Sequence, residues 1–131
     1  LFRDSKGFYW FGGANGLIRF TDPVGERHDA IWYRMGDKTY PLSHNRIRHI
    51  YEDKEQQLWI ATDGSINRYD YATRQFIHYN IVDNTGTYNT NWTYYIFEDT
   101  AGQLWISTCL GGIFVVDKHK LMQSTSGQYI A

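Results

Sequence analysis

The chain has 131 residues, and its 13 Lys and Arg nearly balance its 14 Asp and Glu, which leaves a formal net charge of -1. This balance provides no basic surface for nucleic acids or anionic membranes. Aromatic residues make up 18% of the chain, beside 12 Gly and 2 Pro, and this composition favours an all-β fold because aromatic side chains suit the half-buried surface of a sheet. The single cysteine, Cys109, excludes an internal disulfide framework, and we interpret it as a small buried residue.

One pattern occurs three times along the chain, at residues 4–13, 53–62 and 99–108. In each copy an Asp stands six residues before a Trp, and the pairs are Asp4 and Trp10, Asp53 and Trp59, and Asp99 and Trp105. The Trp residues are 49 and 46 residues apart. A period of 46 residues with four short β-like runs per repeat is typical of a β-propeller blade.

The second repeat shows the expected elements most clearly. In chain order, we predict strands near 46–52, 58–62, 65–70 and 75–79, with a tight polar hairpin at 53–57. The second of these strands is apolar without alternation, which indicates burial on both faces between neighbouring blades. No stretch has the 3.6-residue apolar period of an amphipathic helix, so helix is expected to be essentially absent.

The predicted fold class is therefore all-β, with about three four-stranded antiparallel blades of an incomplete propeller. We expect one propeller fragment over residues 1–131, with blade repeats at approximately 1–44, 45–90 and 91–131. A propeller closes with about four to eight blades. The open blade faces, rich in Trp and Tyr, are thus expected to be covered by missing blades or by other copies of the chain.

The segment Leu58-Trp59-Ile60-Ala61-Thr62 carries a family resemblance, together with Glu52-Asp53 before it and Ile66-Asn67-Arg68-Tyr69-Asp70 after it. It resembles the two-component regulator propeller repeat, whose usual core reads Leu-Trp-Ile-Gly-Thr. The Gly position of that core is occupied by small residues in the three copies, namely Gly12, Ala61 and Ser107. The first copy has Tyr-Trp-Phe in place of Leu-Trp-Ile and is the most divergent.

The resemblance implies a role in signal transduction. Such repeats typically build the periplasmic sensor region of hybrid two-component histidine kinases in Bacteroidetes such as Bacteroides. That region detects oligosaccharides and controls polysaccharide-utilisation genes. The resemblance therefore implies a periplasmic location, an oligosaccharide ligand, and a membrane-anchored, dimeric parent protein. Kinase activity would belong to domains outside this chain, and we expect no enzyme activity within it.

Residues that recur in every copy are interpreted as structural. The recurring Trp side chains are predicted to pack between blades, and the recurring Asp side chains to accept backbone N–H groups in the following hairpin. The adjacent carboxylates of Glu52 and Asp53 point to opposite faces of a strand, so they cannot flank one glycosidic bond. His49 and His78 lie on predicted strands and are expected to be partly buried.

Residues that differ between copies at the entry to the inner strands are the candidates for ligand binding. Arg46 in one copy corresponds to Trp92 in the next, and Arg48 corresponds to Tyr94. Aromatic faces suit the C–H side of a sugar ring, and amide and guanidinium groups suit its hydroxyls. The predicted ligand-binding residues are Asn45, Arg46, Arg48, Tyr88, Asn91, Trp92 and Tyr94.

Two other functions remain open from the sequence, and each would be recognised by a different experiment. A protein-interaction propeller would bind a partner protein and no glycan, whereas a carbohydrate-active propeller enzyme would turn over a polysaccharide. The expected partners are an oligosaccharide and either further blades or other copies of this chain, with no nucleic acid bound. No catalytic residue, cofactor or metal site is predicted.

Overall fold

The computed structural model describes residues 1–21, 30–39, 41–124 and 128–130, which form three sheets and one short helix. The first sheet contains β1 (Phe2–Arg3), β2 (Tyr9–Gly13), β3 (Gly16–Phe20) and β4 (Ile31–Tyr33). The second contains β5 (Ile47–Glu52), β6 (Leu58–Thr62), β7 (Ser65–Asp70) and β8 (Gln75–Val82), with β12 (Gln128–Ile130) at its edge. The third contains β9 (Thr93–Glu98), β10 (Gln103–Thr108) and β11 (Ile113–Asp117).

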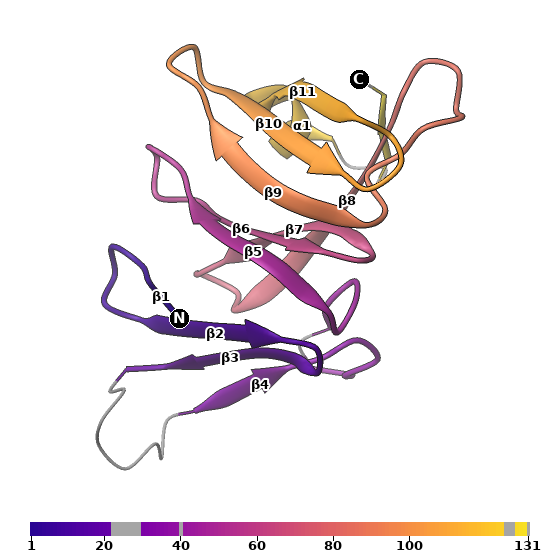
Figure 1. The fold of residues 1–131 in the computed structure, drawn as a ribbon. Helices are drawn as coiled ribbons and strands as arrows, with labels where there is room; N and C mark the ends of the chain where they lie inside the picture. The colour runs from indigo at the N-terminus through magenta and orange to yellow at the C-terminus, as the bar shows by residue number, and fades with distance from the viewer. Residues whose placement is uncertain (22–29, 40, 125–127, 131) are drawn as a thin grey trace.

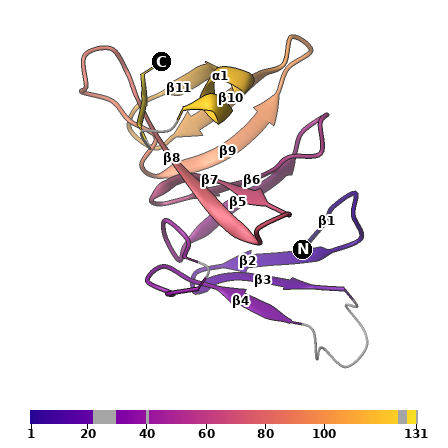
Figure 2. The same cartoon turned by 180° about the vertical axis from the view of Figure 1, so that it is seen from behind.

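The three sheets stack face to face in chain order, as Figures 1 and 2 show from opposite sides. Within each sheet, consecutively numbered strands are hydrogen-bonded antiparallel neighbours. This is the arrangement of propeller blades, and the prediction of an all-β propeller fold is confirmed. The four strands predicted in the second repeat correspond to β5 to β8.

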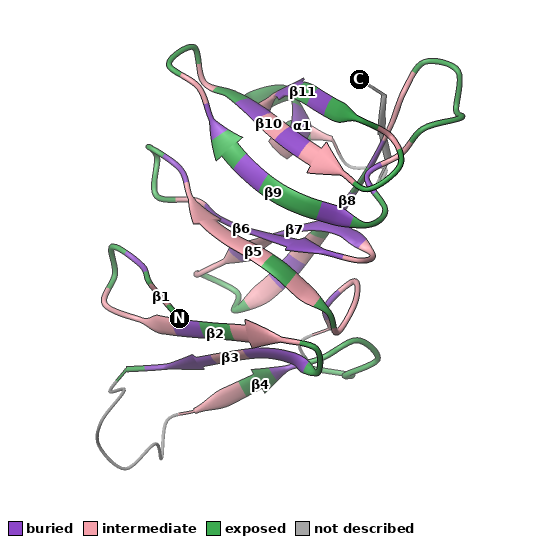
Figure 3. Ribbon diagram, in the orientation of Figure 1, coloured by how far each residue is buried: buried purple, intermediate pink, exposed green. Residues whose placement is uncertain are grey.

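The hydrophobic core lies between the sheets, in two separate clusters. Trp10 and Trp59 are completely buried, so the predicted packing role of these residues is confirmed. All five residues of β6 are buried, as its unbroken apolar sequence predicts for a strand between two neighbours (Figure 3). Trp105 is only partly buried, and its ring packs on Phe97 of the same sheet at a centroid distance of 5.8 Å.

Contacts between blades explain why small residues such as Gly12 and Ala61 occupy the Gly position of the repeat core. A Cβ atom added at Gly12 would lie 2.5 Å from Cγ2 of Ile47 on the inner strand of the next sheet. The equivalent Ala61 is also completely buried. The first two blades thus approach one another closely at Gly12, and a larger side chain there would push them apart.

The turns at residues 4–8, 53–57 and 99–103 lie together at one end of the stack, which we call the hairpin end. At each turn one carboxylate oxygen of the recurring Asp accepts two backbone N–H bonds, at 2.9–3.0 Å, as predicted. Its other oxygen accepts the indole N–H of the Trp six residues later, at 2.8–2.9 Å. The Asp–Trp spacing therefore reflects a direct hydrogen bond.

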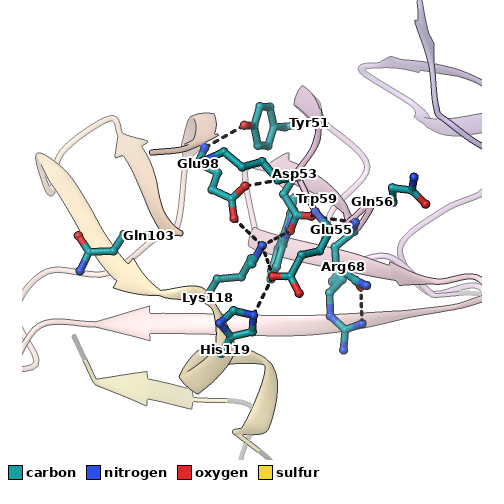
Figure 4. A network of polar contacts seen from close by, with 12 residues as sticks. Tyr51, Asp53, Glu55, Gln56, Trp59, Arg68, Glu98, Gln103, Lys118 and His119 are labelled. Carbon is teal, nitrogen blue, oxygen red and sulfur yellow. Dashed lines mark hydrogen bonds and ion pairs between the residues drawn. The ribbon is translucent and has the colours of Figure 1, made fainter. Parts of the chain in front are cut away.

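Contacts between adjacent blades also recur at the hairpin end. The hydroxyl of Tyr71 donates to Asp4 of the preceding blade at 2.7 Å. At the equivalent place in the next blade, Lys118 forms ion pairs with Asp53 at 3.2 Å, Glu55 at 2.8 Å and Glu98 (Figure 4). Burial lowers the pKa of Lys118, but its hydrogen bonds with the carboxylates outweigh burial and raise that pKa above its ordinary value.

The helix α1 (Lys118–Gln123) corrects the expectation that helix is essentially absent. The side chain of Asp117 caps its N-terminus by accepting the backbone N–H of Lys120 at 3.1 Å, and Lys118 and Leu121 are buried. A turn this short is stabilised by its cap and its packing, so it leaves no periodic signal in the sequence. Within the described residues, this helix is far too short to cross a membrane.

Two further expectations about single residues are corrected by the structure. His78 is exposed rather than partly buried because it points outward from β8, the outermost of the four blade strands, whereas His49 is partly buried as predicted. Cys109 is exposed because it belongs to the turn between β10 and β11. The strand β12 pairs in parallel with β8 of the second sheet, a pairing that the repeat pattern did not predict.

Candidate ligand-binding groove

A groove of about 680 Å³ lies at the end of the stack opposite the hairpin end, and we call this the loop end. The described parts of four connecting segments form it, at residues 34–39 with 41–46, 63–64, 83–92 and 109–112. They link the strands of all three sheets. The lining residues are Met35, Ser43, His44, Asp63, Gly64, Thr87, Tyr88, Asn89, Asn91, Trp92, Leu110 and Gly111.

Trp92 holds an unusual backbone conformation in this groove. Its φ angle is +57°, in the left-handed region that residues other than glycine seldom adopt. Its N–H donates to the carbonyl of Asp63 at 3.2 Å, and its own carbonyl accepts the N–H of Cys109 at 3.0 Å. The backbone of Trp92 is therefore clamped between turns of the second and third sheets, and its side chain remains 49% exposed.

The loop 83–92 places Tyr88 and Asn91 beside Trp92. Asp83 organises this loop, since its carboxylate accepts the hydroxyl of Thr85 at 2.6 Å and the backbone N–H of Tyr88 at 3.0 Å. These two hydrogen bonds hold the pKa of Asp83 below its ordinary value, and the bond from Thr85 is the larger cause. The ring of Tyr88 is 52% exposed, so it presents an accessible aromatic surface within the groove.

Arg48 lies beside the groove, where its guanidinium group is engaged by Asp63. Its Nε donates to Oδ1 at 2.7 Å and its Nη2 to Oδ2 at 3.2 Å, and Arg46 approaches the same carboxylate at 3.9 Å. The hydrogen bond with Asp63 raises the pKa of Arg48 above its ordinary value. The guanidinium also lies over the ring of Tyr94, 5.1 Å from its centroid.

Asn45 connects the first two sheets. Its side-chain oxygen accepts the backbone N–H of Met35 at 2.7 Å, and its carbonyl accepts the N–H of Gly16 at 2.7 Å. The bond from Gly16 holds Asn45 against the start of β3, whereas the bond from Met35 joins two parts of the connection between β4 and β5. The amide oxygen of Asn45 is thus engaged within the protein.

The structure brings three of the seven predicted residues, Tyr88, Asn91 and Trp92, into the lining of the groove. The other four lie next to it, and they are Asn45, Arg46, Arg48 and Tyr94. Among the lining residues that the sequence reasoning missed, Asp63 had a usable signal. It corresponds to Ala14 and Cys109 in the other copies, so it varies at a turn as a ligand-binding residue would.

The family model described as two component regulator propeller matches residues 41–64. This match runs from the segment before β5, through β5 and β6, to Gly64 in the groove. Residues 41–64 thus match one copy of the two component regulator propeller repeat. The resemblance read from the Leu-Trp-Ile-Ala-Thr segment is therefore confirmed. Comparison with curated protein sequences gave no match.

Three similar solved structures are extracellular domains from B. thetaiotaomicron. Two structures of the BT4673 extracellular domain are 99% identical over 100% of this chain, with TM-scores of 0.97; one is assigned to a one component system and the other to a hybrid two component system. The extracellular domain of the hybrid two component system BT3049 is 27% identical over 92% of the chain, with a TM-score of 0.71. The predicted location outside the cytoplasm is confirmed by these likenesses, and the chain spans 18% and 17% of the matched chains.

Proposed function

We propose that this chain is part of the ligand-sensing region of a hybrid two-component sensor and that its groove binds an oligosaccharide. The similar solved structures are extracellular domains assigned to such systems, which supports the sensor role. In this proposal, binding switches on polysaccharide-utilisation genes through kinase domains elsewhere in the parent protein. This chain itself performs no catalysis.

The observation that carries the proposal is the conformation of Trp92. A non-glycine residue in the left-handed region costs free energy and persists where the surrounding structure holds it, often at ligand-binding sites. Two hydrogen bonds hold Trp92 in this way, one with the second sheet and one with the third, yet its indole is half exposed instead of buried in a core. The backbone conformation of Trp92 is thus unfavourable by itself, and it presents a flat aromatic surface at the groove.

The groove surrounds this surface with groups that suit a sugar. Its volume of about 680 Å³ falls within the usual range for small-molecule sites, about 300–1,000 Å³. The groove lining that includes the two aromatic residues also includes Ser43, Thr87, Asn89 and Asn91, which carry hydroxyl or amide groups. The rings can contact the C–H face of a sugar while these polar groups bind its hydroxyls.

The position of the groove also suits signalling. Trp92 contacts the turn of the second blade through Asp63 and that of the third blade through Cys109. A ligand that contacts the rings and both turns would favour one relative arrangement of these blades. Such differential affinity for two arrangements is what a ligand needs in order to shift a conformational equilibrium.

The test is isothermal titration calorimetry of the full-length protein against a panel of purified oligosaccharides. Trp92→Ala should weaken the binding of any oligosaccharide ligand at least about tenfold, equivalent to about 1.4 kcal/mol. Trp32→Ala is the matched control because Trp32 on β4 is 48% exposed and lies outside the groove lining. Equal affinity of the two variants would place the ligand elsewhere, and a protein that binds no oligosaccharide would overturn the proposal.

A further inference from the structure

The charges at the groove are distributed unevenly. Among its lining residues as described, Asp63 is the only carboxylate and no Lys or Arg is present. The arginines nearby, Arg46 and Arg48, lie outside the lining and direct their guanidinium groups at Asp63. The groove therefore places a carboxylate, rather than a cation, beside any ligand that enters it.

The guanidinium group of Arg48 is not free to bind an anion, whereas Arg46 approaches Asp63 only at 3.9 Å and keeps a half-exposed side chain. Arg48 uses two of its N–H groups on the two oxygens of Asp63, and its planar face lies over the ring of Tyr94. A ligand carboxylate could bind these two N–H groups of Arg48 only by displacing Asp63. Asp63, whose side chain is only 9% exposed, would then be left without its bidentate partner, which is unfavourable for a poorly solvated carboxylate.

His44 also lines the groove, and its Nδ1 is engaged as the acceptor of the backbone N–H of Arg46 at 3.1 Å. The remaining polar lining consists of hydroxyl, amide and backbone groups, which bind sugar hydroxyls without needing a charged partner.

We propose that the groove selects uncharged oligosaccharides over those that carry uronic acids, and that Asp63 is the residue that sets this preference. This inference rests on the proposed function. Asp63 acts in two ways, because its own charge repels a ligand carboxylate and because it occupies the guanidinium fork that could otherwise bind one.

The test compares two sets of purified tetrasaccharides by calorimetry with the full-length protein. The uncharged set contains glucose, galactose, mannose, xylose and arabinose oligomers, and the acidic set contains galacturonate, glucuronate and mannuronate oligomers. We expect at least one uncharged tetrasaccharide to bind at least tenfold more tightly than every acidic one. An acidic tetrasaccharide that binds as tightly or more tightly would overturn this inference and leave the proposed function standing, whereas no binding in either set would overturn both.

Asp63→Asn tests the residue itself, because the amide keeps the shape of the side chain and removes its charge. We expect the ratio of the affinity for acidic tetrasaccharides to that for the uncharged ligand to rise at least tenfold. Adding Arg48→Gln to this variant should abolish the gain, since it removes the released guanidinium. Unchanged selectivity in a folded Asp63→Asn protein would overturn the assignment to Asp63. If that variant fails to fold, Arg48→Gln is tested alone. The assignment to Asp63 then predicts that the preference for uncharged ligands persists or increases, and loss of that preference would overturn it.

Discussion

The two ends of the blade stack are built on different principles. At the hairpin end, the same contacts are formed at each repeat: an Asp accepts two backbone N–H groups and the indole of the Trp six residues later. At the loop end, equivalent positions hold chemically different residues, as Arg46 and Trp92 show. The comparison indicates that recurring residues hold the blades together and that varying residues create the groove.

The hairpin end itself contains one instructive variation. Tyr71 and Lys118 each follow the last Asp of a strand, and each reaches back to the recurring Asp of the preceding blade. The first junction uses one neutral hydrogen-bond donor, whereas the second uses an ammonium group surrounded by three carboxylates. Replacing either residue should therefore destabilise the contact between the two blades that it joins. The loss of stability depends on how much charge is left unpaired.

The largest effect is expected for Lys118→Ala. The Nζ of Lys118 is buried between Asp53, Glu55 and Glu98, so its removal leaves carboxylates without their cation. Breaking a buried ion pair from one side costs about 3–5 kcal/mol of unfolding free energy. Chemical denaturation of the full-length protein measures the loss, and Lys120→Ala on the exposed face of the same helix is the control. Equal stability of the two variants would contradict the role of this network.

A smaller effect is expected for Tyr71→Phe, which removes a single hydrogen bond to Asp4. Burial is the largest cause of a rise in the pKa of Tyr71 above its ordinary value, and this hydrogen bond is the next. The phenol therefore remains a donor at neutral pH. We expect a loss of about 1.5 kcal/mol, the scale of a hydrogen bond to a charged group. Tyr88→Phe at the loop end should leave stability unchanged in the same denaturation experiment. A comparable loss in Tyr88→Phe would remove the distinction between the two ends.

The smallest effect is expected from the titration of His49. Its Nδ1 accepts the backbone N–H of Ile96 in the next blade at 3.1 Å, and burial lowers its pKa. The unfolded state therefore binds a proton more readily, so stability should fall as the pH is lowered through about 6.5, the ordinary pKa of His. Thermal unfolding between pH 7.5 and 5.5 should show a shallower decline for His49→Gln than for the unchanged protein. Identical slopes would exclude His49 as the source.

The blade architecture could be predicted because it repeats. Three copies of the Asp–Trp pattern define the turns and the strands next to them, and the unbroken apolar sequence of β6 marks a strand covered on both sides. The Asp–Trp hydrogen bond itself follows from tertiary geometry, so only the spacing was visible. The helix α1 was missed because a single capped turn, held by the burial of Lys118, has no periodicity.

The groove could be predicted only in part. Trp92 was found because it differs from its counterpart Arg46 at the strand entry. Asn91 was found because an Asn stands at both strand entries, and Tyr88 because it is the one aromatic residue of the polar loop before the strand. Asp63 was missed because it lies on a different turn, and its pairing with Arg48 spans 15 residues. The left-handed conformation of Trp92 was equally invisible, since it depends on hydrogen bonds to two turns that are distant in sequence.

The most direct test of the difference between the two ends is a hydrogen–deuterium exchange measurement on the full-length protein. Exchange is compared with and without the uncharged oligosaccharide that binds most tightly. The account predicts slower exchange in segments 83–92 and 109–112, which form the groove, and no change in the turns 4–8, 53–57 and 99–103. Protection at those turns, or unchanged exchange around the groove at saturating ligand, would contradict it.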